Sequence, residues 1–90
     1  MYYIKGHGWV EIHRSARKHG ISDHDMCHAV AQAMVVLGVT PGPQGRSLHL
    51  GADSTGRLLE VVSVGRASGR RLIIHAMPMR RKFRTYLSEG

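Results

Sequence analysis

Two apolar runs joined by a short glycine turn constrain the fold of this 90-residue chain more than any other feature. Arg57–Val64 and Arg71–Met77 are rich in β-branched and aliphatic residues, and Ala67-Ser68-Gly69 between them has the composition of a turn. Upstream, Arg46–Leu50 alternates in the same way, and the turn Asp53–Gly56 follows it closely. Strands with such short connections pair with their neighbours, so we predict an antiparallel sheet of sequential hairpins.

Helix signals precede these strands. The segment Glu11–His19 reads as a short helix ended by Gly20, because glycine is favoured directly after a helix. A second helix is predicted to start at Ser22, where Asp25 three residues later makes an acidic variant of the capping box. Apolar residues at helical spacing continue this helix to about Met34.

A third helix is predicted at the end of the chain. Pro78 ends the last strand and suits the first turn of a helix at Met79–Leu87. The secondary structure of two segments stays open. Residues 1–10 form a short strand or an extended arm, and residues 35–37 begin a strand or end the second helix. The predicted fold class is α+β, with a small antiparallel sheet of three to four strands packed against two N-terminal helices and a C-terminal helix. Residues 1–90 are expected to form a single domain.

The net charge of the chain limits the classes of partner that it is expected to bind. The formal net charge is +7 at pH 7, which favours nucleic acid, an acidic protein or an anionic membrane surface. No apolar run approaches the ~18 residues of a membrane span, and the N-terminus lacks the apolar region of a signal peptide. Cys27 is the single cysteine, so no intramolecular disulfide framework exists. We expect a cytoplasmic protein without membrane association. Seven basic residues and no acid lie between Glu60 and Glu89: Arg66, Arg70, Arg71, Arg80, Arg81, Lys82 and Arg84.

Strand alternation suggests which side chains share a face of the sheet. In the last strand, Leu72, Ile74 and Ala76 form an apolar face that should meet the helices, which puts His75 on the opposite face. Glu60 is the only acid within a predicted strand, and we expect it on the same face as His75.

The first strand is expected to add a further histidine to that outer face. Leu48 and Leu50 should face the core, so His49 should point outward. Three arginines are expected at the edges of the same surface: Arg46, Arg57 and Arg71.

An outer face with these groups has the chemical parts for RNA cleavage. Attack of a ribose 2′-hydroxyl on its own phosphate needs a base, an acid for the leaving 5′-oxygen, and cations for the transition state. The alternative stays open that Glu60 pairs with a cross-strand arginine and that His75 is a semi-buried structural residue. A metal site is not expected, because His24, Cys27 and His28 complete no metal-binding motif. No cofactor is expected.

Three segments resemble the BrnT-type toxins of bacterial toxin–antitoxin pairs. HRSARKHGISDHD (His13–Asp25) is similar to their helix–turn–helix opening, LHLGADSTGRLLEVVSV (Leu48–Val64) to their central hairpin, and RRLIIHAMPMRRKFRTYL (Arg70–Leu87) to their C-terminal segment. The resemblance implies a compact RelE-like ribonuclease fold and an endoribonuclease activity that arrests translation. It also implies a cognate antitoxin that neutralises the toxin, and operator DNA bound only through that antitoxin.

The resemblance and the charge pattern together suggest functional positions. The expected catalytic residues are His75, Glu60, Arg57 and Arg80. The expected RNA-binding residues are Lys18, His19, Arg46, His49, Arg71, Arg81, Lys82 and Arg84. The sequence departs from the family where its basic pair follows the last strand, because Met77 and Pro78 stand at those positions.

Two functions therefore remain open at this stage. The first is a toxin that cleaves RNA without a metal ion, and whether it forms an oligomer with itself or with its antitoxin stays open. The second is a non-catalytic basic module that binds an acidic protein or nucleic acid. A DNA-binding protein fits less well, because the second helix has an acidic start and an apolar face rather than the character of a recognition helix.

Overall fold

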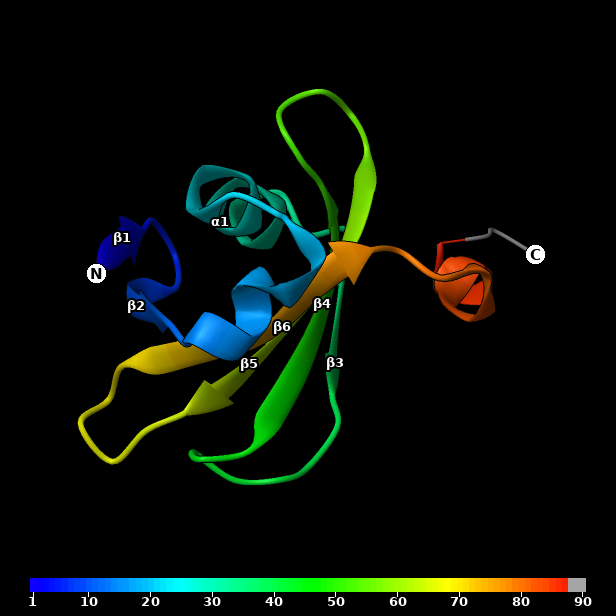
Figure 1. The fold of residues 1–90 in the computed structure, drawn as a ribbon. Coiled ribbons are helices and arrows are strands. Elements are labelled where there is room, and N and C mark those ends of the chain that lie inside the picture. The colour runs from blue at the N-terminus through cyan, green and yellow to red at the C-terminus, as the bar shows by residue number, and fades with distance from the viewer. Residues whose placement is uncertain (88–90) are drawn as a thin grey trace.

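A single mixed sheet forms most of the molecule. In a computed structural model of the protein, which describes residues 1–87, six strands lie in the spatial order β1-β2-β6-β5-β4-β3 (Figure 1). The neighbours β2 and β6 run parallel, and the other neighbouring strands run antiparallel. The strands are β1 (Tyr2–Ile4), β2 (Gly8–Ile12), β3 (Val35–Gly38), β4 (Arg46–Ala52), β5 (Leu58–Gly65) and β6 (Arg71–Pro78).

Three short helices accompany the sheet. They are the 3₁₀ helix η1 (Arg14–His19), the α-helix α1 (Asp23–Ala31) and the 3₁₀ helix η2 (Arg81–Tyr86). In Figure 1, α1 and η1 lie on the same side of the sheet, whereas η2 stands clear of it at the end of the chain. None of the residues of η2 is buried. No helix in the described part of the chain has the length and apolar character to cross a membrane.

The predicted fold class is wrong in both the sheet and the helices. The sheet has six strands rather than three or four, and the β2–β6 pair is parallel. Within residues 1–87, α1 is the only α-helix. The segment predicted as a helix at Glu11–His19 is divided, because Glu11 and Ile12 complete β2 and only the remainder forms η1. The helix predicted at Met79–Leu87 is reduced to η2, which covers no part of the sheet.

The extra strands come from the two segments that sequence reasoning left open. Gly6 and Gly8 adopt φ angles of 87° and 83°, a left-handed conformation that lets the chain turn sharply between β1 and β2. Helix α1 ends before Met34, whose backbone N–H donates to the Leu50 carbonyl oxygen at 2.9 Å. The β-branched residues that follow then form β3 on β4, with Val35 opposite Leu50.

The predicted start of α1 is confirmed. Ser22 is the N-cap, and its hydroxyl accepts a hydrogen bond of 3.1 Å from the backbone N–H of Asp25. The predicted glycine after the preceding helix is also confirmed, since Gly20 has a φ angle of 76° and ends η1. The helix then lies directly on β4 at Gly51, where a Cβ atom would overlap the Ala29 carbonyl oxygen.

The core lies between the sheet and the two helices α1 and η1. Its buried members come from β1, β2, β5 and β6, from η1 and α1, and from the linker between these helices: Ile4, Val10, Ala16, Ile21, Met26, Ala29, Val30, Leu59, Val61, Ile73 and Ala76. Each large apolar side chain buried in this way contributes about 1.5–3 kcal/mol relative to an exposed position. The small residues of α1 allow the helix to approach the sheet closely.

A β-bulge in β6 changes the predicted faces of this strand. The register passes from Val62 opposite His75 to Ser63 opposite Ile73, so Ile74 is the extra residue. Ile73 and Ala76 consequently both face the core, and Ile74 does not join it. The prediction that Leu72 and Ile74 share the core face with Ala76 is therefore wrong, whereas His75 lies on the face opposite the core as predicted.

The prediction that His49 points outward is also wrong. His49 lies opposite the core residue Val61 and is only 2% exposed. Leu48 and Leu50 occupy the other face of β4 and are buried too, at 6% and 0% exposure. Alternation predicts a face correctly only when one side of a strand meets water, and β4 is covered on both sides.

Candidate functional site

A buried carboxylate is the centre of the candidate site. Glu60 lies in β5 with 1% of its surface exposed. Arg80 donates to it from Nη2 to Oε1 at 2.7 Å and from Nε to both carboxylate oxygens at 3.0 and 3.2 Å. The backbone N–H of Arg80 adds a bond of 3.0 Å to Oε2. A buried charge needs this degree of pairing, because an unpaired carboxylate in the interior costs several kcal/mol.

His75 completes the cluster from β6. Its Nε2 atom lies 3.0 Å from Glu60 Oε1, and its side chain is 30% exposed. Burial acts to raise the pKa of the Glu60 carboxyl, but the hydrogen bonds from Arg80 and His75 outweigh it and lower that pKa below its ordinary value. An ionised carboxylate can only accept, so His75 donates to Glu60 from Nε2–H.

Two local features of β6 bring these three residues together. The bulge at Ile74 places His75 opposite Val62, on the same face as Glu60. After Pro78, the Met79 N–H donates to the Leu58 carbonyl oxygen at 3.0 Å. This bond extends the pairing of β5 and β6 by one step and turns Arg80 back onto Glu60.

A second imidazole lies beside the cluster. The His19 ring at the end of η1 is centred 5.8 Å from the His75 ring, with an angle of 77° between the ring planes. His19 and its neighbour Lys18 are exposed. Sequence reasoning assigned both residues to RNA binding but missed the contact between the two histidines. No local signal predicts it, because the contact depends on how η1 packs beside β6.

Arg57 is not brought into this cluster. Its Nε donates to Asp53 Oδ2 at 2.9 Å, and its backbone N–H donates to Asp53 Oδ1, also at 2.9 Å. The hydrogen bond from the Thr55 hydroxyl is the largest cause that lowers the pKa of Asp53, to about 2. Arg57 therefore stabilises the β4–β5 turn, and the structure ties it to Asp53 rather than to Glu60.

Two of the expected RNA-binding residues are also held by the fold. Arg71 donates from Nε to Ser63 Oγ at 2.8 Å, and His49 Nε2 is 2.8 Å from the same hydroxyl. Burial, followed by the nearby His7 and Arg71, lowers the pKa of His49 to about 4, so this ring is neutral at pH 7. A neutral, buried ring makes no contact with RNA, and His49 is withdrawn from the RNA-binding set.

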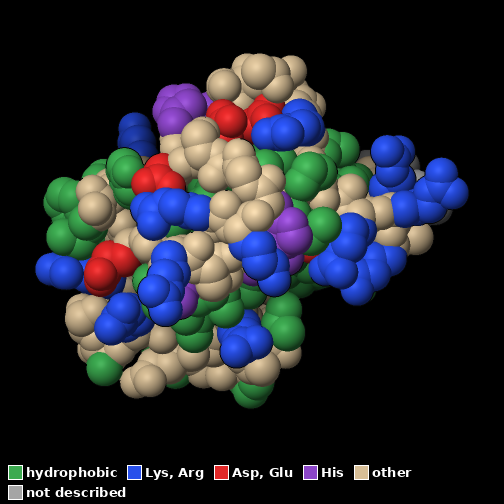
Figure 2. Space-filling model, in the orientation of Figure 1, with side chains coloured by type: hydrophobic (Ala, Val, Ile, Leu, Met, Phe, Trp, Pro, Cys, Tyr) green, Lys and Arg blue, Asp and Glu red, His purple; other side chains and the backbone are tan. Residues whose placement is uncertain are grey.

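The remaining expected RNA-binding residues are exposed. Arg46 begins β4, and Arg81, Lys82 and Arg84 lie on η2. Lys82 Nζ and the Arg80 guanidinium lie 5.1 and 5.5 Å from the centre of the Phe83 ring. Figure 2 shows the Lys and Arg side chains over much of one face, with a dense group around η2 and a histidine next to that group.

The side chains of His24, Cys27 and His28 on α1 do not gather around a common point that could hold a metal ion. His28 Nδ1 lies 2.9 Å from the Ala52 carbonyl oxygen, and the His24 and His28 rings are centred 6.3 Å apart. No group of three His, Cys, Asp or Glu side chains in residues 1–87 is arranged to hold a metal ion.

Comparison of the chain with known protein families, with curated proteins and with solved structures finds no match in any of the three. The likeness to BrnT-type toxins therefore depends on the sequence motifs alone and stays a prediction.

Proposed function

We propose that this protein is a toxin that cleaves RNA, with His75 as its general base. The observation that carries the proposal is the Glu60–His75–Arg80 cluster. It presents a partly exposed imidazole, oriented by a buried carboxylate, within a face rich in cations. Glu60 is a positioning residue here, because its oxygens are used by Arg80 and His75 and it does not contact RNA.

The proposed chemistry follows from the protonation of His75. With Nε2–H bonded to Glu60, the Nδ1 lone pair accepts the proton of a ribose 2′-hydroxyl as the oxygen attacks the adjacent phosphorus. The ionised carboxylate stabilises the imidazolium that forms, as in other carboxylate–histidine pairs. The 5′-oxygen then leaves with a proton, and the products are a 2′,3′-cyclic phosphate and a free 5′-hydroxyl.

His19 is the second acid–base group in this proposal. When protonated, its ring can give a proton to the leaving 5′-oxygen, and its centre lies 5.8 Å from that of His75. Charge that develops on the phosphate is stabilised by cations nearby. Two cations are proposed for this role. They are Arg80, whose Nη1 makes no bond to Glu60, and Lys18, which adjoins His19 in the chain.

The biological setting is proposed from the resemblance. The toxin would arrest translation by cutting RNA, and a cognate antitoxin would neutralise it. Operator DNA would be bound only through that antitoxin. A net charge of +7 supports both an RNA substrate and an acidic surface on the antitoxin.

A non-catalytic basic module is the second candidate. The observation in its favour is that Arg80 uses its Nε and Nη2 atoms on a fully buried carboxylate, which is a common structural arrangement. In that case His75 only completes the network, and the exposed cations of η1 and η2 bind nucleic acid or an acidic protein without cleavage.

The test compares three proteins on an end-labelled RNA in buffer with EDTA. Wild type should produce discrete fragments with 2′,3′-cyclic phosphate ends. His75→Ala should lower the cleavage rate by about 100-fold or more, the usual contribution of a general base. Lys5→Gln, which removes an exposed charge from the turn between β1 and β2 and lies outside the expected RNA-binding set, should keep most of the rate. Intact RNA with the wild type, together with retained RNA binding, would favour the non-catalytic module instead.

A further inference from the structure

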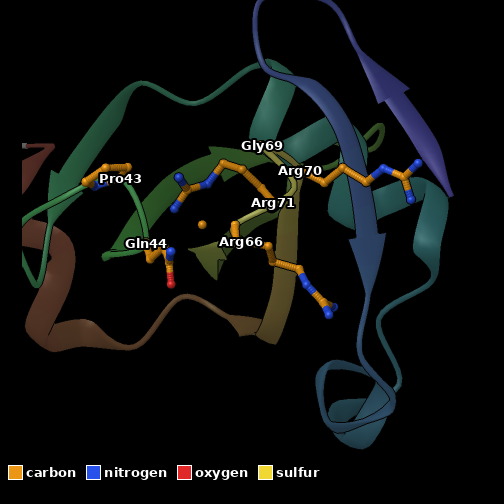
Figure 3. Close-up of a pocket in the computed structure, with 8 residues that line it drawn as sticks. Pro43, Gln44, Arg66, Gly69, Arg70 and Arg71 are labelled. Carbon is orange, nitrogen blue, oxygen red and sulfur yellow. The ribbon is translucent and has the colours of Figure 1, made fainter.

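A pocket separate from the His75 site lies between the linker that precedes β4 and the turn that joins β5 to β6. Its volume is about 460 Å³. Pro43 and Gln44 form the linker side (Figure 3). Gly65 at the end of β5 and Ala67 in the turn form part of the opposite side. Its charged lining consists of Arg66, Arg70 and Arg71.

The two walls of the pocket are fixed to each other by close backbone contact. The Gly65 N–H donates to the Gly45 carbonyl oxygen at 3.2 Å. A Cβ atom at residue 65 would overlap the Pro43 carbonyl oxygen, so only glycine permits this approach. The fold therefore holds the backbone of the two walls in place, and the exposed side chains of Arg66 and Arg70 add to the lining.

Arg71 is anchored so that one end of its guanidinium group stays available. Its Nε donates to Ser63 Oγ at 2.8 Å. Its Nη2 lies within 3.2–3.3 Å of the Gly45 and Ser63 carbonyl oxygens and of Ser47 Oγ. Its Nη1 atom has no hydrogen-bond partner among residues 1–87. Figure 3 shows the side chain reaching across the pocket toward Pro43 and Gln44. A guanidinium group held in this way is a preorganised donor for a phosphate oxygen.

The charge around the pocket is unbalanced. None of its lining residues is acidic. Arg66 has no carboxylate partner in the described part of the chain. Arg70 lies 3.8 Å from Glu11, but both side chains are more than a third exposed, so this ion pair is weak. In Figure 3, Arg66 and Arg70 extend away from the pocket, and as exposed side chains they can rotate toward a bound anion.

We propose that this pocket binds the phosphate monoester of a nucleotide, with Arg71 as the fixed donor and with Arg66 and Arg70 as mobile ones. The volume lies within the ~300–1,000 Å³ of small-molecule sites, which is enough for a nucleotide. The phosphate belongs either to a free nucleotide or to the 5′ end of an RNA strand. The RNA source rests on the proposed function, whereas binding of a free nucleotide does not.

The first experiment follows backbone amide NMR shifts during titration with adenosine 5′-monophosphate or with adenosine. The monophosphate should bind saturably and shift the amides of Gln44 and of residues 65–69, and inorganic phosphate should displace it. Adenosine should give no saturable shifts. Shifts centred on η2, or equal affinity for adenosine, would overturn the proposal. Two RNA tetramers, with a 5′-phosphate or a 5′-hydroxyl, then distinguish the two sources of the phosphate.

The second experiment changes the pocket without touching the anchor of Arg71. Ala67 is exposed in the turn, so Ala67→Asp adds a negative charge to the pocket at little structural cost. Ala67→Asn is the matched neutral control. The aspartate should weaken binding of the monophosphate about tenfold or more, and the asparagine about twofold or less. Equal weakening by both variants would contradict the proposal.

A third variant separates this inference from the proposed function. His75→Ala should lower the rate of RNA cleavage by about 100-fold or more and leave the affinity for the monophosphate unchanged. A wild type that cleaves RNA but does not bind the monophosphate refutes the pocket and leaves the nuclease standing. A wild type that binds the monophosphate but does not cleave RNA refutes the nuclease and supports the pocket.

Discussion

Replacement of Glu60 by glutamine should destabilise the protein strongly and change how its stability depends on pH. Glutamine keeps the shape of the side chain but removes its charge, and its amide nitrogen would face the N–H groups of Arg80. Removing one partner of a buried ion pair costs about 3–5 kcal/mol. The Arg80 side chain is 47% exposed, so water can solvate the freed guanidinium, and we expect a smaller loss of about 2–3 kcal/mol.

The loss should be measured by urea denaturation at pH 7 and should lower Tm by roughly 10–20 °C for a domain of this size. Glu11→Gln is the control, because Glu11 is 37% exposed and its contact with Arg70 is 3.8 Å long. The control should change the free energy of unfolding by about 0.5 kcal/mol or less.

The loss of stability in the Glu60→Gln variant should also depend on pH, in a direction that the pKa of Glu60 fixes. The pKa of Glu60 is lower in the folded state than the ordinary glutamate value of 4.5, so the unfolded chain takes up a proton first as the pH falls. The stabilisation by Glu60 is therefore complete above about pH 4.5 and is lost as the pH falls through the folded-state pKa. The difference between wild type and Glu60→Gln should shrink in this range. A constant difference from pH 7 to pH 3, or a cost of ~0.5 kcal/mol or less at pH 7, would refute the reasoning.

Two further predictions concern the core. His49 is buried with a pKa lowered to about 4, so the unfolded state binds a proton first as the pH falls below 6.5, and stability should fall by up to about 3 kcal/mol by pH 4. His49→Phe should flatten this part of a plot of urea-unfolding free energy against pH, and an unchanged slope would contradict the assignment. Gly51→Ala should cost about 1–3 kcal/mol, because its Cβ overlaps the Ala29 carbonyl oxygen. Gly38→Ala, which meets no atom within 4 Å, should cost ~0.5 kcal/mol or less in the same measurement, and equal costs would show that the close approach is unimportant.

Sequence reasoning located the parts of the candidate site that depend on neighbouring strands. The prediction that Glu60 and His75 share a face agrees with their 3.0 Å contact, because both lie in adjacent strands joined by a short turn. Arg80, predicted as a further catalytic residue, bonds to Glu60 from the segment that directly follows β6, and this bond was not predicted from the sequence. The contact with His19 was missed, since η1 is distant in the sequence and reaches β6 only through tertiary packing. The pocket at Arg71 was missed for the same reason, because its walls come from two separate turns.

The sequence by itself determined the features that depend on local backbone preference. These are the turn at Asp53–Gly56, the strands that follow it, the Ser22 cap of α1 and the Gly20 stop of η1. Each depends on groups within a few residues of one another, whose free energies are set by the chain itself.

Only the tertiary structure decided how the sheet was completed and which polar groups it buried. Residues 1–10 carry no local signal that specifies β6 as the partner of β2, and this parallel pairing adds β1 and β2 to the sheet. The pairing of β3 with β4 then completes the six strands. The bulge at Ile74 and the burial of His49 likewise depend on what covers each face. Such choices follow from the free energy of burial against distant segments, which no local pattern in the sequence contains.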